Sequence, residues 1–139
     1  MKNLNPEFPM RKLPVSKYPR RILCADDNTI LGDILVRFFT QAGHTVNHAA
    51  DGLEAWDRMS KDLAYFEVLV TNHEMPGLSG LELVDLLRQA DYRGRIIVHS
   101  GALTVRQTAD YRALKVDGIV AKATAAEELL RVVEAFADA

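Results

Sequence analysis

From about residue 20 onward, the apolar residues of the chain follow two alternating patterns. Short, almost continuous apolar runs alternate with longer segments in which apolar residues recur every three or four positions. The short runs are typical of buried strands, and the longer spacing is typical of helices with one face in the core. The predicted strands are residues 21–25, 44–49, 66–71, 95–99 and 119–121. The predicted helices are residues 29–42, 52–61, 81–90, 104–114 and 125–136.

The same spacing predicts which helical side chains face the core. In the first two helices they are Ile30, Leu31, Ile34, Leu35, Phe38, Phe39, Leu53, Trp56 and Met59. In the last helix they are Leu129, Val133 and Phe136. Ser79, followed three residues later by Glu82, has the pattern of a capping box and is expected to begin the third helix.

Five strand–helix pairs with nearly continuous apolar strands favour a parallel sheet covered by helices on both faces. Short connections favour right-handed crossovers. We therefore expect an α/β, doubly wound fold of five parallel strands in the flavodoxin-like order 2-1-3-4-5, with two helices on one face and three on the other. Ligands of such folds bind beyond the carboxyl ends of the strands. The polar residues at those ends are Asp26, Asp27, Asn72, Ser100 and Lys122.

Four of the five prolines lie within the first 19 residues, which show no sustained periodicity. Because proline interrupts both helical and sheet hydrogen bonding, we expect residues 1–19 to form an arm before a single domain over residues 20–139. The arm could be native or added by cloning. The first 20 residues hold five basic side chains and one acidic one, so the rest of the chain is acidic and nothing favours nucleic-acid binding.

Composition narrows the class of protein further. No apolar run approaches the roughly 20 residues of a membrane-spanning helix. The single cysteine, Cys24, lies in a predicted strand and is expected to be a core residue rather than a nucleophile. It cannot form an internal disulfide, which fits a cytoplasmic protein. The four histidines are not at the spacing of a zinc site.

The five polar residues at the strand ends have complementary chemistry. Asp26 and Asp27, with a polar residue at position 72, make an oxygen-rich pocket suited to a hard cation. Lys122 and the hydroxyl of Ser100 can hold phosphate oxygens. A cation and a phosphoryl group are therefore the ligands that this set of residues favours.

Four motifs, in their order and spacing, resemble those of receiver domains of two-component signalling. They are Asp26-Asp27-Asn28, Asn72-His-Glu-Met75-Pro76-Gly77-Leu-Ser-Gly80, Ser100-Gly101-Ala102 and Gly118-Ile-Val-Ala-Lys122. Each alone is weak evidence, but together they make residues 20–139 similar to this family. In the family, the residue three before the Met-Pro pair is the aspartate that accepts phosphate from a histidine kinase. In this chain that residue is Asn72.

The resemblance implies a role for each pocket residue. Asp27 would be the main Mg²⁺ ligand, Asp26 would act through water, and the backbone carbonyl of Glu74 would complete the protein ligands. Ser100 and Lys122 would contact phosphoryl oxygens.

Three positions depart from the family pattern. Asn72 offers no oxygen able to attack phosphorus in line, so phosphorylation there is not expected, and its neutral oxygen should weaken the Mg²⁺ site. Ile119 stands where the family often has an aromatic switch residue, and Ala123 stands where proline is usual. Asn72 could be natural, making a pseudo-receiver that signals by binding alone, or it could be an engineered Asp-to-Asn change in a normal receiver. The other two departures slightly favour a natural origin.

We therefore expect a phosphorelay receiver domain that is not an enzyme. Implied partners are a sensor histidine kinase or phosphotransfer protein, and an output domain or second copy bound through the fourth helix, fifth strand and fifth helix. On that face the side chains expected to point to solvent are Arg106, Tyr111, Lys115, Asp117 and Arg131. A small flavodoxin-like enzyme is disfavoured, because two acids after the first strand would repel the phosphate of a flavin, and an aspartyl phosphatase would need acids two positions apart.

Overall fold

A computed structural model describes residues 16–135 of the chain. Its strands are β1 (Arg21–Ala25), β2 (Thr45–Ala49), β3 (Val68–Thr71), β4 (Arg95–Ser100) and β5 (Gly118–Ala121). Its helices are α1 (Thr29–Gln41), α2 (Gly52–Ser60), α3 (Gly80–Gln89), α4 (Val105–Ala113) and α5 (Ala126–Glu134). All ten predicted elements are present, with bounds within two residues of those predicted. Residues 1–15 of the predicted arm, and Phe136, lie outside the described residues.

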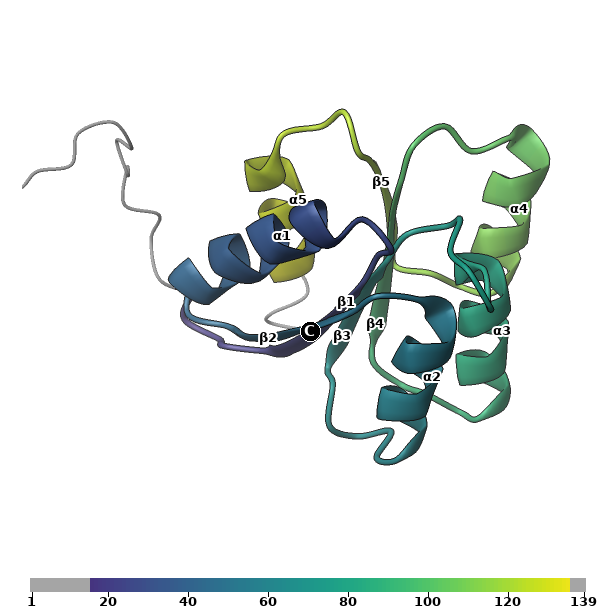
Figure 1. Ribbon diagram of the computed structural model, residues 1–139, viewed down its shortest axis with the longest axis horizontal. Coiled ribbons are helices and arrows are strands. Elements are labelled where there is room, and N and C mark those ends of the chain that lie inside the picture. The colour runs from purple at the N-terminus through teal and green to yellow at the C-terminus, as the bar shows by residue number, and fades with distance from the viewer. Residues whose placement is uncertain (1–15, 136–139) are drawn as a thin grey trace, which may run out of the picture.

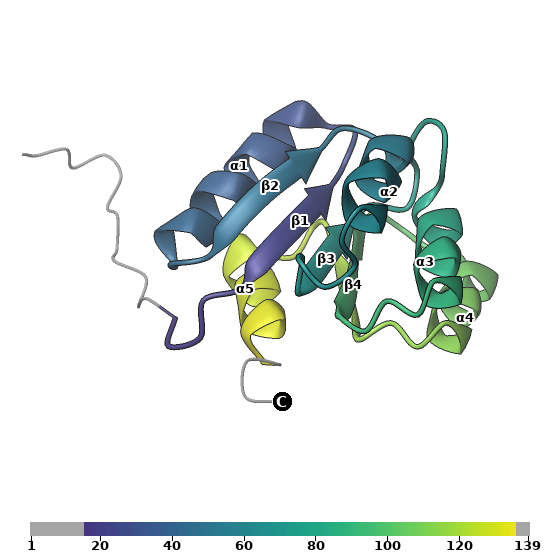
Figure 2. The ribbon, with the colours of Figure 1, turned by 90° about the horizontal axis from the view of Figure 1, so that it is seen from below.

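The five strands form one parallel sheet in the order β2-β1-β3-β4-β5. Ala25 pairs with both Ala49 and Thr71, so neighbouring strands reach a common edge. Helices α1 and α5 cover one face of the sheet, and α2, α3 and α4 cover the other (Figure 1). Figure 2 shows β1 and β2 side by side and pointing the same way. The predicted doubly wound α/β fold is confirmed.

Each face of the sheet has its own apolar core. Cys24, Leu35 and Leu129 belong to the core under α1 and α5, while Leu23 and Leu87 belong to the core under the other three helices. Successive residues of β1 thus face opposite cores, which explains the continuous apolar sequence of this strand. Cys24 is buried, as predicted, and burial together with the charge of Asp26 raises the pKa of its thiol to about 12.

Three apolar side chains predicted to face the core are exposed instead. Ile30 is 73% exposed and Ile34 is 51% exposed. They precede Leu31 and Leu35 by one residue, which turns them about 100° around α1 and away from the buried stripe. Leu53, 55% exposed, also lies outside the core, against Gly77 of the loop between β3 and α3.

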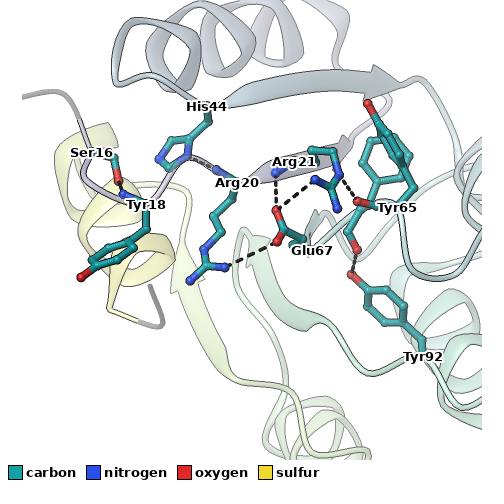
Figure 3. Close-up of polar contacts among 9 residues, drawn as sticks. Ser16, Tyr18, Arg20, Arg21, His44, Tyr65, Glu67 and Tyr92 are labelled. Atoms are coloured by element: carbon teal, nitrogen blue, oxygen red, sulfur yellow. Dashed lines mark hydrogen bonds and ion pairs between the residues drawn. The ribbon is translucent and has the colours of Figure 1, made fainter. Parts of the chain in front are cut away.

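The edge of the sheet opposite the carboxyl ends is held by a polar network around the start of β1 (Figure 3). The carboxylate of Glu67 accepts the backbone N–H of Arg21 at 3.0 Å and pairs with the guanidinium of Arg20 at 3.5 Å. His44 Nδ1 accepts the backbone N–H of Arg20 at 2.9 Å, and its Nε2 lies 3.0 Å from a carboxylate oxygen of Glu134. These contacts fix the first strand and the last turn of α5 to one rim. None of the helices within residues 16–135 has the length and apolar character needed to cross a membrane.

Candidate functional site

The polar residues predicted at the strand ends converge at the carboxyl edge of the sheet. Asp27, Asn72, Ser100 and Lys122 line one cavity of about 350 Å³. The other residues lining it are His73, Glu74, Gly101, Ala102 and Gln107. The convergence follows from the parallel sheet, because β1, β3, β4 and β5 all end at this edge.

Asp26 is buried and holds the loop between β1 and α1 in shape. One carboxylate oxygen accepts the backbone N–H of Asn28 at 2.9 Å, and the amide oxygen of Asn28 caps α1 by accepting the N–H of Leu31 at 3.0 Å. On the far side, His48 Nε2 lies 2.7 Å from the backbone carbonyl of Asp26, which can only accept, so His48 donates. A side chain at Gly32 would collide with the His48 ring, so a glycine is required there. This framework leaves Asp27 exposed toward the cavity.

A second contact joins β1 to the end of β5. The ammonium of Lys122 lies 2.9 Å from the other carboxylate oxygen of Asp26, whose side chain is only 4% exposed. His99 of β4 is buried close to this pair. Burial lowers the pKa of His99, the positive charge of Lys122 lowers it further, and the negative charge of Asp26 opposes both. His99 is therefore neutral at pH 7.

The side chain of Asn72 is buried and is engaged as a donor. Its amide nitrogen donates to a carboxylate oxygen of Asp27 at 3.2 Å and to the backbone carbonyl of Glu74 at 2.8 Å. Both acceptors lack a hydrogen, so only the nitrogen of the amide can face them. The Asn72 amide thus lies between the two groups that the family resemblance assigns as ligands of Mg²⁺.

The hydrogen bonds of these oxygen atoms determine how a cation can fit in the pocket. One carboxylate oxygen of Asp27 and the backbone carbonyl of Glu74 accept from the Asn72 amide, and the carboxylate oxygens of Asp26 contact Asn28 and Lys122. These oxygen donors suit Mg²⁺, but an ion bound between that Asp27 oxygen and the Glu74 carbonyl takes the place of both hydrogen bonds from Asn72.

The loop from Asn72 to Ser79 is fixed at both ends. The hydroxyl of Thr71 donates to the backbone carbonyl of Asn72 at 2.9 Å, and the N–H of Gly80 donates to the carbonyl of His73 at 2.6 Å. Ser79 and Glu82 form the predicted capping box, with hydrogen bonds of 2.9 and 3.1 Å. The start of α3 therefore holds the loop that carries Asn72.

Tyr111 was predicted to face solvent, and this prediction is wrong. The side chain is fully buried, and its hydroxyl lies 2.6 Å from Nδ1 of His73. Burial raises the pKa of Tyr111. The signal in the sequence was the spacing of Gln107, Tyr111 and Leu114, which places Tyr111 in the middle of the inward stripe of α4. His73 also had no predicted role, although it lines the cavity beside Asn72.

Of the other residues expected on that face, Asp117 is also largely inward. Its side chain is 18% exposed, pairs with Arg95 at 3.5 Å and accepts the backbone N–H of Ile96 at 2.8 Å. Arg106 and Arg131, by contrast, have side chains that are 88% and 72% exposed. Lys115 is exposed as well.

Comparisons with known proteins agree with this fold. The sequence profile of the response regulator receiver domain matches residues 22–134. The chain therefore belongs to the receiver domain family and is a response regulator receiver domain of two-component signalling. Ile119, partly buried against the core, occupies the position at which the family resemblance predicted an aromatic residue.

Three relatives illustrate the similarity. A chemotaxis protein CheY homolog of Campylobacter jejuni is 38% identical over 69 residues, which cover 49% of this chain and 52% of that protein. The response regulator receiver protein CpdR of Brucella abortus is 27% identical over 115 residues, covering 83% and 94%. The response regulator RppA of Synechocystis is 34% identical over 68 residues, covering 49% and 29%. The chain thus spans about half, or less, of the length of two of these curated relatives.

Solved structures show the same fold. A CheY-like receiver domain protein from Methanospirillum hungatei superposes with a TM-score of 0.81 at 20% identity, covering 86% of this chain and 94% of that one. The N-terminal domain of an uncharacterised protein from Wolinella succinogenes gives a TM-score of 0.78 at 25% identity, covering 84% and 93%.

Proposed function

We propose that this chain is a pseudo-receiver, which does not accept phosphate at position 72 and signals through noncovalent contacts. The observation that carries the proposal is the pair of hydrogen bonds donated by the Asn72 amide to Asp27 and to the Glu74 carbonyl. Asn72 stands at the phosphoacceptor position of the receiver family. Phosphoryl transfer needs a charged oxygen in line with the phosphorus, and this side chain instead presents a donor nitrogen whose lone pair is delocalised.

The rest of the pocket keeps the groups expected to bind a phosphoryl oxygen. The hydroxyl of Ser100 and the ammonium of Lys122 line the cavity. Lys122 is already paired with Asp26, which gives it a structural role without phosphate. We propose that these residues now serve mainly to hold the ends of β1, β4 and β5 together, and that the domain catalyses no reaction.

Mg²⁺ is proposed to bind weakly to this pocket. Asp27, the Glu74 carbonyl and, through water, Asp26 would hold the ion, which when bound would offset negative charge on a phosphoryl group. Because the Asn72 amide donates to two of these three groups, Mg²⁺ binding costs two hydrogen bonds in addition to the missing charge of an aspartate ligand.

A second candidate function is a normal receiver that an engineered Asp-to-Asn change has inactivated. It is favoured by the residues around Asn72, because Asp27, Ser100 and Lys122 line the same cavity and Asp26 pairs with Lys122. In that case Asn72→Asp should restore phosphate acceptance.

The proposed partners are a sensor histidine kinase or phosphotransfer protein, and an output domain or second copy of the chain. We place the binding surface for the second copy on α4, β5 and α5, and define it by the exposed Val105, Arg106, Lys115 and Arg131. Val105, at the start of α4, is 89% exposed, and the side chains of Arg106 and Arg131 are 88% and 72% exposed. Exposed basic side chains together with a single exposed apolar one favour a modest, reversible interface.

Charge reversal tests this surface. The double substitution Lys115→Glu and Arg131→Glu should weaken self-association in sedimentation velocity without lowering the melting temperature. The matched control, Arg58→Glu with Lys61→Glu, reverses two exposed basic residues at the end of α2 and just after it, and should leave association unchanged. Sedimentation as a monomer before and after reversal would contradict the proposed dimer surface.

A further inference from the structure

Helix α4 packs against the domain mainly through one polar aromatic side chain. Of the α4 residues, Val105–Ala113, only Tyr111 is buried. Its hydroxyl lies 2.6 Å from Nδ1 of His73, and the two rings meet edge to face with centroids 5.5 Å apart. The side chain that anchors α4 therefore has its polar end at the pocket, one residue from Asn72.

This hydrogen bond satisfies a buried polar group. A buried hydroxyl needs a hydrogen-bond partner, and His73 Nδ1 lies within reach of Tyr111. Gly80 makes this approach possible, because a Cβ there would lie 2.7 Å from the Tyr111 hydroxyl and would collide with the backbone carbonyl of Asn72.

The same loop connects His73 to the ligands of the pocket. Asn72 and Glu74 flank His73 in sequence, and the Asn72 amide binds both Asp27 and the Glu74 carbonyl. The bonds of Asn72 thus act on the backbone that flanks His73, and His73 contacts Tyr111, the one side chain that is buried within α4. Ile119, which has no polar atom, cannot make an equivalent hydrogen bond from β5.

We propose that the His73–Tyr111 hydrogen bond couples the Asn72 pocket to α4, so that a change at either one alters the other. Coupling between two sites is reciprocal, so a partner that shifts α4 also shifts the balance of hydrogen bonds at Asn72. The use of α4 as a binding surface rests on the proposed function, whereas the coupling itself does not.

A double-mutant cycle on the full chain tests the coupling. Asn72→Ala removes the bonds to Asp27 and Glu74, and Tyr111→Phe removes only the hydroxyl. Amide hydrogen exchange, measured by NMR over Thr108–Leu114, reports the local opening of α4. We expect Asn72→Ala to lower the protection of these amides about five-fold when residue 111 is tyrosine, the effect of losing roughly one hydrogen bond, and less than about two-fold when it is phenylalanine. Asn72→Ser serves the same purpose if the alanine variant does not fold.

Tyr92→Phe is the matched control. Tyr92 is also a buried tyrosine, and its hydroxyl donates to the Phe66 carbonyl at 2.7 Å on the opposite rim (Figure 3). This substitution should lower global stability while leaving the response of α4 to Asn72→Ala intact. The proposed coupling is overturned if Asn72→Ala lowers amide protection in α4 equally with tyrosine and with phenylalanine at position 111. It is also overturned if Asn72→Ala leaves that protection unchanged in both cases. Neither result bears on phosphate acceptance or self-association, so the two proposals fail separately.

Discussion

Asn72→Asp introduces the aspartate that the family resemblance predicts at this position, and we expect it to destabilise the metal-free domain. The substitution replaces a donor nitrogen with a charged oxygen, 3.2 Å from a carboxylate oxygen of Asp27 and 2.8 Å from the carbonyl of Glu74. Two hydrogen bonds are lost, at about 1 kcal/mol each. Two carboxylates at about 4 Å repel by roughly 4 kcal/mol at an effective dielectric constant of 20.

The net cost is smaller than this sum. Asp27 is exposed to solvent, and the ammonium of Lys122, which lines the same cavity as residue 72, should offset part of the added charge. We therefore expect a loss of about 3 kcal/mol in unfolding free energy, which for a domain of this size corresponds to a fall of about 10 °C in melting temperature. Mg²⁺ at 100 times its dissociation constant should return about 2.7 kcal/mol to the Asn72→Asp variant.

Thermal and urea unfolding with EDTA and with Mg²⁺ measures both effects. Asn72→Ala loses the same hydrogen bonds without adding charge, so its difference from Asn72→Asp isolates the repulsion. The double substitution Asp27→Asn with Asn72→Asp exchanges amide and carboxylate at constant charge and should recover most of the loss. An Asn72→Asp variant at least as stable as the original chain in EDTA would refute the reasoning.

Two further changes should affect stability in predictable directions. Burial and the charge of Lys122 lower the pKa of His99, so the unfolded chain binds the proton more readily than the folded one. The contribution of neutral His99 to the unfolding free energy should be fully present above about pH 6.5 and fall below that pH, by at most about 1.4 kcal/mol per pH unit. In urea unfolding measured at several pH values, His99→Leu should show a flatter pH dependence. Ala125, the N-cap residue of α5, has extended backbone geometry and makes no side-chain capping hydrogen bond. Glu128 is at the third helical position. Ala125→Ser should therefore complete a capping box and raise unfolding free energy by about 1 kcal/mol, and no gain in urea unfolding would contradict this.

The fold could be predicted from the sequence because its signals are local and repeated. A strand such as β1 is buried on both faces, so its apolar run is continuous, and Ser79 with Glu82 marks the start of α3. Once the strands are parallel, their carboxyl ends meet at one edge. The convergence of Asp27, Asn72 and Lys122 in one cavity therefore follows from the topology.

The hydrogen bonds inside the pocket could not be predicted in the same way. The family resemblance assigns Asn72 to the phosphoacceptor position but does not say that its amide donates to Asp27, which depends on the side-chain torsion and the path of the loop. Helical spacing can place Tyr111 on the inward side of α4, but its contact with His73 depends also on the absence of a side chain at Gly80, 31 positions away in another helix. Both hydrogen bonds join residues distant in sequence, and the periodicity of apolar residues does not predict such pairs.

The central proposal is that Asn72 makes this receiver domain unable to accept phosphate. Intact-mass measurement after incubation with acetyl phosphate and Mg²⁺ tests it directly, with the original chain and the Asn72→Asp variant treated side by side. We expect no added phosphoryl group on the original chain and one on the variant, since Ser100 and Lys122 remain in the cavity. A stable phosphoryl adduct on the chain with Asn72 would contradict the account, because another side chain of the pocket would then be the acceptor.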